Sequence, residues 1–100
     1  MANAAERILI IIVVRTGGFA GLRREWRTEA RDEDDWLPLI EACPWRQVPP
    51  ADQLSRDRFV WRIEVKAPDL RRKATLPDAA LDGPWRALVQ RVQETAESER

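Results

Sequence analysis

The sequence contains no histidine and no tyrosine, and its single cysteine is Cys43. Without histidine, Ser–His and Cys–His nucleophile arrangements are excluded, together with nearly every type of zinc site. One cysteine cannot form an internal disulfide, so the fold does not rely on an oxidising compartment. We therefore predict a protein that is not an enzyme and that holds no metal or cofactor of its own.

An excess of charge of one sign and a long apolar run are also missing. Lysine and arginine number 17, as do aspartate and glutamate, so the formal net charge is zero. Nucleic-acid binding would need a basic excess on one face, and a membrane span would need about 20 consecutive apolar residues. The apolar run Ile8–Val14 is followed by Arg15 rather than by a small-residue cleavage site, unlike a signal peptide. We expect no nucleic acid, no membrane and a cytoplasmic location.

The first part of the chain has the pattern of a β-hairpin. One hundred residues predict one domain, 1–100, with loose ends at 1–6 and 94–100. The run Ile8–Val14 is rich in β-branched residues and apolar on both faces, which suits a strand at the centre of a sheet. In the segment Leu22–Thr28, an apolar side formed by Leu22 and Trp26 alternates with charged residues. This second strand is predicted to be half exposed and to lie at an edge.

An amphipathic helix is predicted next. The acidic run Asp32–Asp35 suits a helix N-terminus better than a metal site, both as caps and against the helix dipole. Pro38 is tolerated in a first turn, and Pro44 ends the helix. The connection Trp45–Ser55 is expected to attach to the core through Trp45 and Val48. The apolar stripe of this helix is formed by Trp36, Leu39, Ile40 and Cys43, of which the cysteine fits a small core residue better than a reactive thiol.

A second hairpin and a second helix complete the order. Phe59–Val65 alternates apolar and charged residues, Ala67–Asp69 is a turn, and Leu70–Leu76 reads as the partner strand. Asp82 is a plausible N-cap for a final helix with a further apolar stripe. The order β-β-α-β-β-α predicts an α+β two-layer sandwich, a four-stranded antiparallel sheet with two helices on one face. The helical stripe consists of Trp85, Leu88, Val89 and Val92.

Basic residues alternate along the second hairpin. They could form a basic sheet face, but Glu64 interrupts them, and a solvated outer face is the better interpretation. The residues concerned are Arg58, Arg62, Arg71 and Lys73.

The tip of the first hairpin is the candidate functional element. Its three glycines, Gly17, Gly18 and Gly21, allow tight reversal or close approach of another molecule, and Phe19 is the large side chain among them. A phosphate-binding loop is not indicated, because the lysine and the following helix are missing. Either Phe19 folds back onto the sheet, or the loop is presented to a partner, as loops on rigid scaffolds often are.

The sequence resembles the emfourin family, small protein inhibitors of thermolysin-like metallopeptidases of the protealysin group. The resemblance rests on an apolar first strand that runs into Arg15-Thr16-Gly17-Gly18-Phe19-Ala20-Gly21, and on the later segment Asp57–Val65. It extends from about Ile8 to Val92. The chain departs from the family at Thr16, where serine is frequent, and at Trp61, where tyrosine is expected.

The resemblance implies inhibition of a zinc endopeptidase by a loop that occupies its cleft. Phe19 would fill a pocket beside the metal, a backbone carbonyl near Gly18 would approach the zinc, and Arg15 would make a polar contact at the rim. The zinc would belong to the partner, and the free inhibitor would be a monomer. The partner-binding residues implied are Arg15, Thr16, Gly17, Gly18, Phe19, Ala20 and Gly21.

An interaction module without a peptidase target is the alternative. The exposed edge strand Leu22–Thr28 would then recruit another chain, or a second copy of this one.

Overall fold

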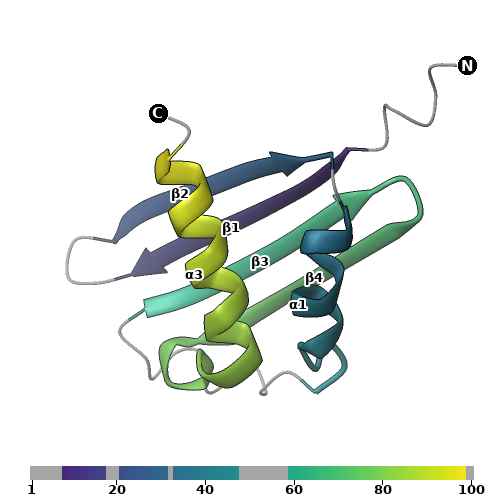
Figure 1. The fold of residues 1–100 in the computed structure, drawn as a ribbon. Helices are drawn as coiled ribbons and strands as arrows, with labels where there is room; N and C mark the ends of the chain where they lie inside the picture. The colour runs from purple at the N-terminus through teal and green to yellow at the C-terminus, as the bar shows by residue number, and fades with distance from the viewer. Residues whose placement is uncertain (1–7, 18–20, 32, 48–58, 99–100) are drawn as a thin grey trace, which may run out of the picture.

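Two β-hairpins form one antiparallel sheet (Figure 1). The computed structural model describes residues 8–17, 21–31, 33–47 and 59–98. β1 (Leu9–Gly17) pairs with β2 (Leu22–Ala30), and β3 (Phe59–Ala67) pairs with β4 (Leu70–Pro77). β1 also pairs with β3, which gives the strand order β2-β1-β3-β4. The predicted central position of the first strand and edge position of the second are confirmed.

β1 occupies the centre because both of its faces are apolar. On the face that carries the helices, Leu9, Ile11 and Val13 are 0% exposed. On the opposite, outer face, Ile10 and Ile12 are partly buried by the side chains of the neighbouring strands. A strand with this composition is stable only where strands flank it on both sides.

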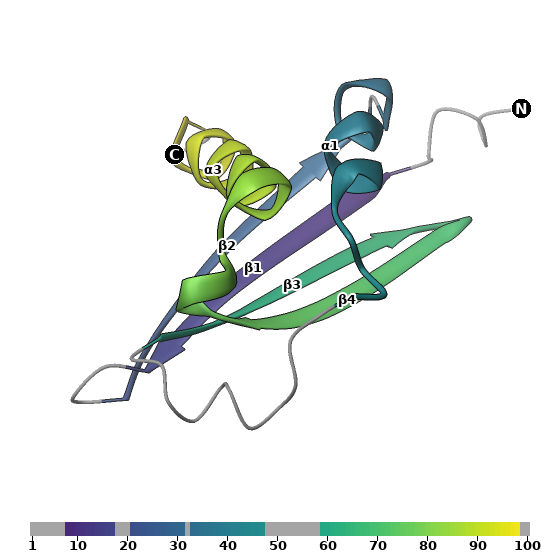
Figure 2. The ribbon, with the colours of Figure 1, turned by 90° about the horizontal axis from the view of Figure 1, so that it is seen from below.

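Both helices lie on one face of the sheet, as the view from below shows (Figure 2). α1 (Leu37–Ala42) follows the 3₁₀ turn η2 (Glu33–Asp35), and α3 (Gly83–Ser98) follows the 3₁₀ turn η3 (Asp78–Ala80). The order is therefore β-β-α-β-β-α, and the predicted α+β fold class is confirmed. No described helix is long and apolar enough to cross a membrane.

The core lies between the two layers. Each helix contributes its predicted apolar stripe, and the inner face of the sheet supplies the opposing side chains. In the two stripes, the residues that are at most 5% exposed are Trp36, Ile40, Cys43, Trp85, Leu88, Val89 and Val92, of which Trp36 and Cys43 are the caps of α1. Trp45 packs edge-on against Trp85 at 4.8 Å between ring centroids and donates its indole N–H to the carbonyl of Ile40 at 2.7 Å. The attachment predicted for Trp45 is confirmed, whereas Val48 lies outside the described residues.

The ends of the helices differ from the prediction. The acidic run was expected to cap α1, but the N-cap is Trp36, which makes no side-chain capping hydrogen bond, and Asp34 and Asp35 belong to the separate turn η2. Trp36 is 5% exposed, and α1 begins at the next residue, Leu37. The chain was also expected to fray from Glu94, but α3 continues to Ser98 because Ala96 still packs against the core. Residues 1–6 lie outside the described residues.

Cys43 is part of this core, as predicted. It is 4% exposed, and its thiol donates to the carbonyl of Leu39 at 3.4 Å. Burial raises the pKa of the Cys43 thiol from 9.0 to about 11, because the charged thiolate is poorly solvated there.

The raised pKa of Cys43 predicts a pH-dependent stability. The folded state holds this proton more tightly than the unfolded state, so the free energy of unfolding should fall as the pH rises from about 9 to about 11. Urea unfolding of the wild type and of Cys43→Ala at pH 7, 9 and 10 measures the effect. The difference between the two proteins should change only above pH 8, and a constant difference would contradict the assignment.

Candidate partner-binding loop

The structure places part of the predicted loop at the free end of the β1–β2 hairpin. Arg15, Thr16 and Gly17 are the last three residues of β1, and Gly17 pairs with Leu22, the first residue of β2. Gly21 lies in the turn before Leu22. This end of the hairpin extends beyond α3 in both views (Figures 1 and 2). Gly18, Phe19 and Ala20 lie outside the described residues, so both interpretations of Phe19 remain predictions.

Glycine is required at both sides of the turn by backbone conformation. Gly17 has φ 123° and Gly21 has φ 63°, values that residues other than glycine rarely adopt. A Cβ atom built on Gly21 would have no heavy atom within 4 Å. The constraint at Gly21 is therefore the left-handed backbone, and the space around it is open.

Arg15 lies on the inner face, against three aromatic rings. Its guanidinium carbon is 4.8 Å from the ring centroid of Phe59, 5.8 Å from that of Trp61 and 5.9 Å from that of Trp26. We call Arg15, Trp26, Phe59 and Trp61 the arginine–aromatic cluster. A cation over several ring faces is attracted to each of them. The cluster joins the three strands β1, β2 and β3 next to the loop.

Further contacts fix the rings of this cluster. The rings of Trp26 and Trp61 stack at 6.0 Å with 15° between their planes. The indole N–H of Trp61 donates to the Asp78 carboxylate at 2.8 Å, and the guanidinium of Arg24 lies 4.8 Å from the ring of Trp26. The loop therefore starts from a base whose side chains are held by several neighbours.

Thr16 and Arg15 lie on opposite faces of the sheet, because successive residues of a strand alternate. Thr16 lines a shallow hollow of about 160 Å³ on the outer face. Arg15 and Thr16, two of the predicted site residues, are therefore neighbours along the chain that lie on different surfaces of the sheet. The other residues around this hollow are Val14, Arg23, Val60, Arg62 and Thr75.

Leu22 was expected to share the buried side of β2 with Trp26, and this is wrong. Its side chain is on the predicted face, but it is 73% exposed, the only strongly exposed large apolar residue among those described. The start of β2 extends beyond α3 (Figure 1). An apolar side chain is therefore exposed beside the loop.

The described residues offer no candidate metal centre. They contain no group of three or more histidine, cysteine, aspartate or glutamate residues placed to hold a metal ion. On the outer face, Arg62, Arg71 and Lys73 are exposed, as expected for a solvated surface, while Arg58 lies outside the described residues. The arrangement is suited to contact with another macromolecule.

The fold and the exposed hairpin define a small α+β binding protein, and the comparison with family models identifies it further. The Emfourin family model matches residues 13–93, and the chain belongs to this family. The family is one of protein inhibitors and not of enzymes. No curated protein and no solved structure matches the chain.

Removal of the Arg15 charge should loosen the base of the loop. We expect Arg15→Gln to lower the free energy of unfolding by about 1–2 kcal/mol, because the contacts with three rings are lost. The matched control is Arg23→Gln, whose exposed ion pair with Glu25 at 2.9 Å contributes about 0–1 kcal/mol. Urea unfolding followed by tryptophan fluorescence measures both. An equal decrease in the free energy of unfolding for the two variants would show that the contacts of Arg15 with the rings stabilise the protein no more than an exposed ion pair does.

Proposed function

We propose that this protein inhibits a thermolysin-like zinc metallopeptidase by placing the segment Thr16–Gly21 in its active-site cleft. Family membership supports an inhibitor with a metallopeptidase as its partner. The observation that carries the choice of surface is the free end of the β1–β2 hairpin, with open space at Gly21 and an exposed Leu22.

The chemistry of such a cleft suits this segment. A metallopeptidase of this class binds an extended chain and takes a bulky apolar side chain in a pocket beside its metal. In this proposal Phe19 fills that pocket, and a backbone carbonyl near Gly18 faces the zinc ion, which belongs to the peptidase. The inhibitor needs no metal ligand of its own, in agreement with its lack of histidine.

The arginine–aromatic cluster supports tight binding from a small loop. A segment held at both ends by a rigid base loses less conformational entropy on binding than a free peptide. Arg15, which the resemblance suggested as a rim contact, is assigned instead to holding that base, because its guanidinium already faces three rings. Leu22 adds apolar surface at the edge of the contact.

Self-association through β2 is the less favoured alternative. β2 is an edge strand, but its outer face carries two internal ion pairs, Arg23–Glu25 and Arg27–Glu29, both at 2.9 Å. Charged side chains along an edge protect it against pairing with other chains. We therefore propose that the free protein is a monomer.

The first experiment is a titration of a thermolysin-like enzyme with the purified protein and a peptide substrate. We expect peptide cleavage to fall in proportion to added protein until the two are equimolar. Full activity across several such enzymes, together with self-association in light scattering, would favour the edge-strand alternative.

Phe19 is the proposed anchor, and its removal should weaken inhibition. Phe19→Ala should raise the inhibition constant by a factor of about 30 or more, equivalent to at least ~2 kcal/mol, as for a binding hot spot. The control is Leu70→Ala at the opposite end of the sheet, which should leave the inhibition constant unchanged. A folded Phe19→Ala protein with wild-type inhibition would refute the anchor assignment.

A further inference from the structure

β4 forms the other edge of the sheet and differs from β2 in its charge. Among the described strands it pairs with β3 alone. Its residues Arg71, Arg72 and Lys73 are consecutive and exposed. An edge strand presents backbone N–H and C=O groups that can pair with an added strand.

The three basic side chains are directed to both faces of the sheet. Arg72 pairs with the core residue Val65 and therefore lies on the inner face, whereas Arg71 and Lys73 lie on the outer face. On the outer face, Lys66 is directly opposite Arg71, and like charges in that position destabilise a sheet. An acidic ligand between them would relieve this repulsion.

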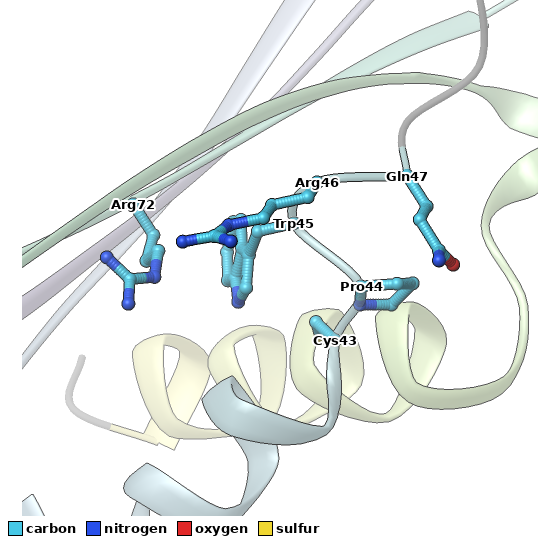
Figure 3. Close-up of a pocket in the computed structure, with 6 residues that line it drawn as sticks. All are labelled: Cys43, Pro44, Trp45, Arg46, Gln47 and Arg72. Carbon is cyan, nitrogen blue, oxygen red and sulfur yellow. The ribbon is translucent and has the colours of Figure 1, made fainter.

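Each face has a hollow beside this edge. The inner hollow, of about 510 Å³, lies between β4 and the segment after α1 (Figure 3). In the close-up, the side chain of Arg46 crosses in front of or behind Trp45 in the direction of Arg72, and all three line this hollow (Figure 3). The outer hollow has a volume of about 230 Å³. It is lined by the outer-face residues Glu64, Lys66, Arg71 and Lys73, together with Val65 and Arg72, which lie between them in the two strands.

Basic side chains outnumber carboxylates around the two hollows. The single acidic residue lining the two hollows is Glu64, which is 3.8 Å from Lys66. Glu64 also lies directly opposite Lys73 in the pairing of β3 with β4. We call Arg46, Lys66, Arg71, Arg72 and Lys73 the β4 basic patch.

We propose that the edge of β4 binds an acidic, extended segment of a partner protein by strand addition. The main chain of the segment pairs with β4, and its side chains alternate between the two hollows. Adjacent acidic residues then place one carboxylate near Arg46 and Arg72 and the next near Arg71 and Lys73. Charge complementarity selects this occupant, because a second copy of β4 would bring like charges together.

The test uses a short peptide probe, acetyl-Val-Glu-Asp-Glu-Val-amide, and the full-length protein at low ionic strength. Isothermal titration should show binding at least tenfold tighter than that of the neutral analogue acetyl-Val-Gln-Asn-Gln-Val-amide. Amide NMR signals of β4 should shift, and those of β2 should not. The acidic peptide with N-methylated backbone should bind at least tenfold more weakly, because it cannot donate hydrogen bonds to the strand edge.

Variants locate the site on the protein. The double change Arg72→Gln and Lys73→Gln should weaken the acidic peptide at least tenfold, with its thermal midpoint measured by circular dichroism to confirm folding. The matched control on the other edge, Arg23→Gln with Arg27→Gln, should bind like the wild type. No binding of the acidic peptide, equal binding of its N-methylated form, or equal losses in both double variants would each overturn the proposal. None of these measurements involves a peptidase, so their outcome is independent of the proposed inhibition.

Discussion

The structure depends on one constraint, which is that β1 must be covered on both faces and flanked on both edges. Its inner side chains Leu9, Ile11 and Val13 are fully buried, and Ile10 and Ile12 on the outer face are partly buried. Such a strand is stable in the middle of a sheet, so β2 and β3 must pair with it. The helices then cover the inner face, and the end of β1 that reaches beyond them becomes the free end of the molecule (Figure 1).

At that end the row of apolar inner-face side chains in β1 is followed by the charged side chain of Arg15, which contacts aromatic rings. Arg15 occupies the inner position after Val13, where an apolar residue would be exposed to solvent, and the rings of Trp26, Phe59 and Trp61 surround its guanidinium. The arrangement links β1 with both neighbouring strands beside the loop. A binding loop needs such a base, because a segment that is already positioned loses less entropy in a complex. The opposite part of the sheet has no comparable cluster among the described residues, and its character comes from the β4 basic patch instead.

Local patterns were sufficient to predict the elements and the fold class. The apolar run of β1, the alternation in β3 and the stripes of α1 and α3 each have a period that identifies the element. These local patterns did not predict where the helices end or how much of the sheet they cover. Leu22 fits the apolar side of β2, but it is 73% exposed, and the start of β2 extends beyond α3 (Figure 1). The same applies to the end of α3, where Ala96 alone gives little signal of burial.

The candidate site was predicted in part, since glycine at Gly17 and Gly21 does take positive φ values. The contacts of Arg15 with aromatic rings were not predicted, because Phe59 and Trp61 are distant in sequence and meet it only through the pairing of β1 with β3. The alternation along β1 was the available signal, because it places Arg15 on the same face as the buried residue Val13. Arg71 and Lys73 of the β4 basic patch were correctly interpreted as exposed. The opposition of Lys66 and Arg71 follows from the register, which a charge pattern alone does not determine.

The central claim is that the free end of the β1–β2 hairpin enters the peptidase cleft. Hydrogen–deuterium exchange of the protein, alone and saturated with a thermolysin-like peptidase, tests it most directly. The account predicts that slower exchange in the complex is concentrated in residues 16–22. Slower exchange confined to the helices or to β4, with residues 16–22 exchanging as in the free protein, would contradict it.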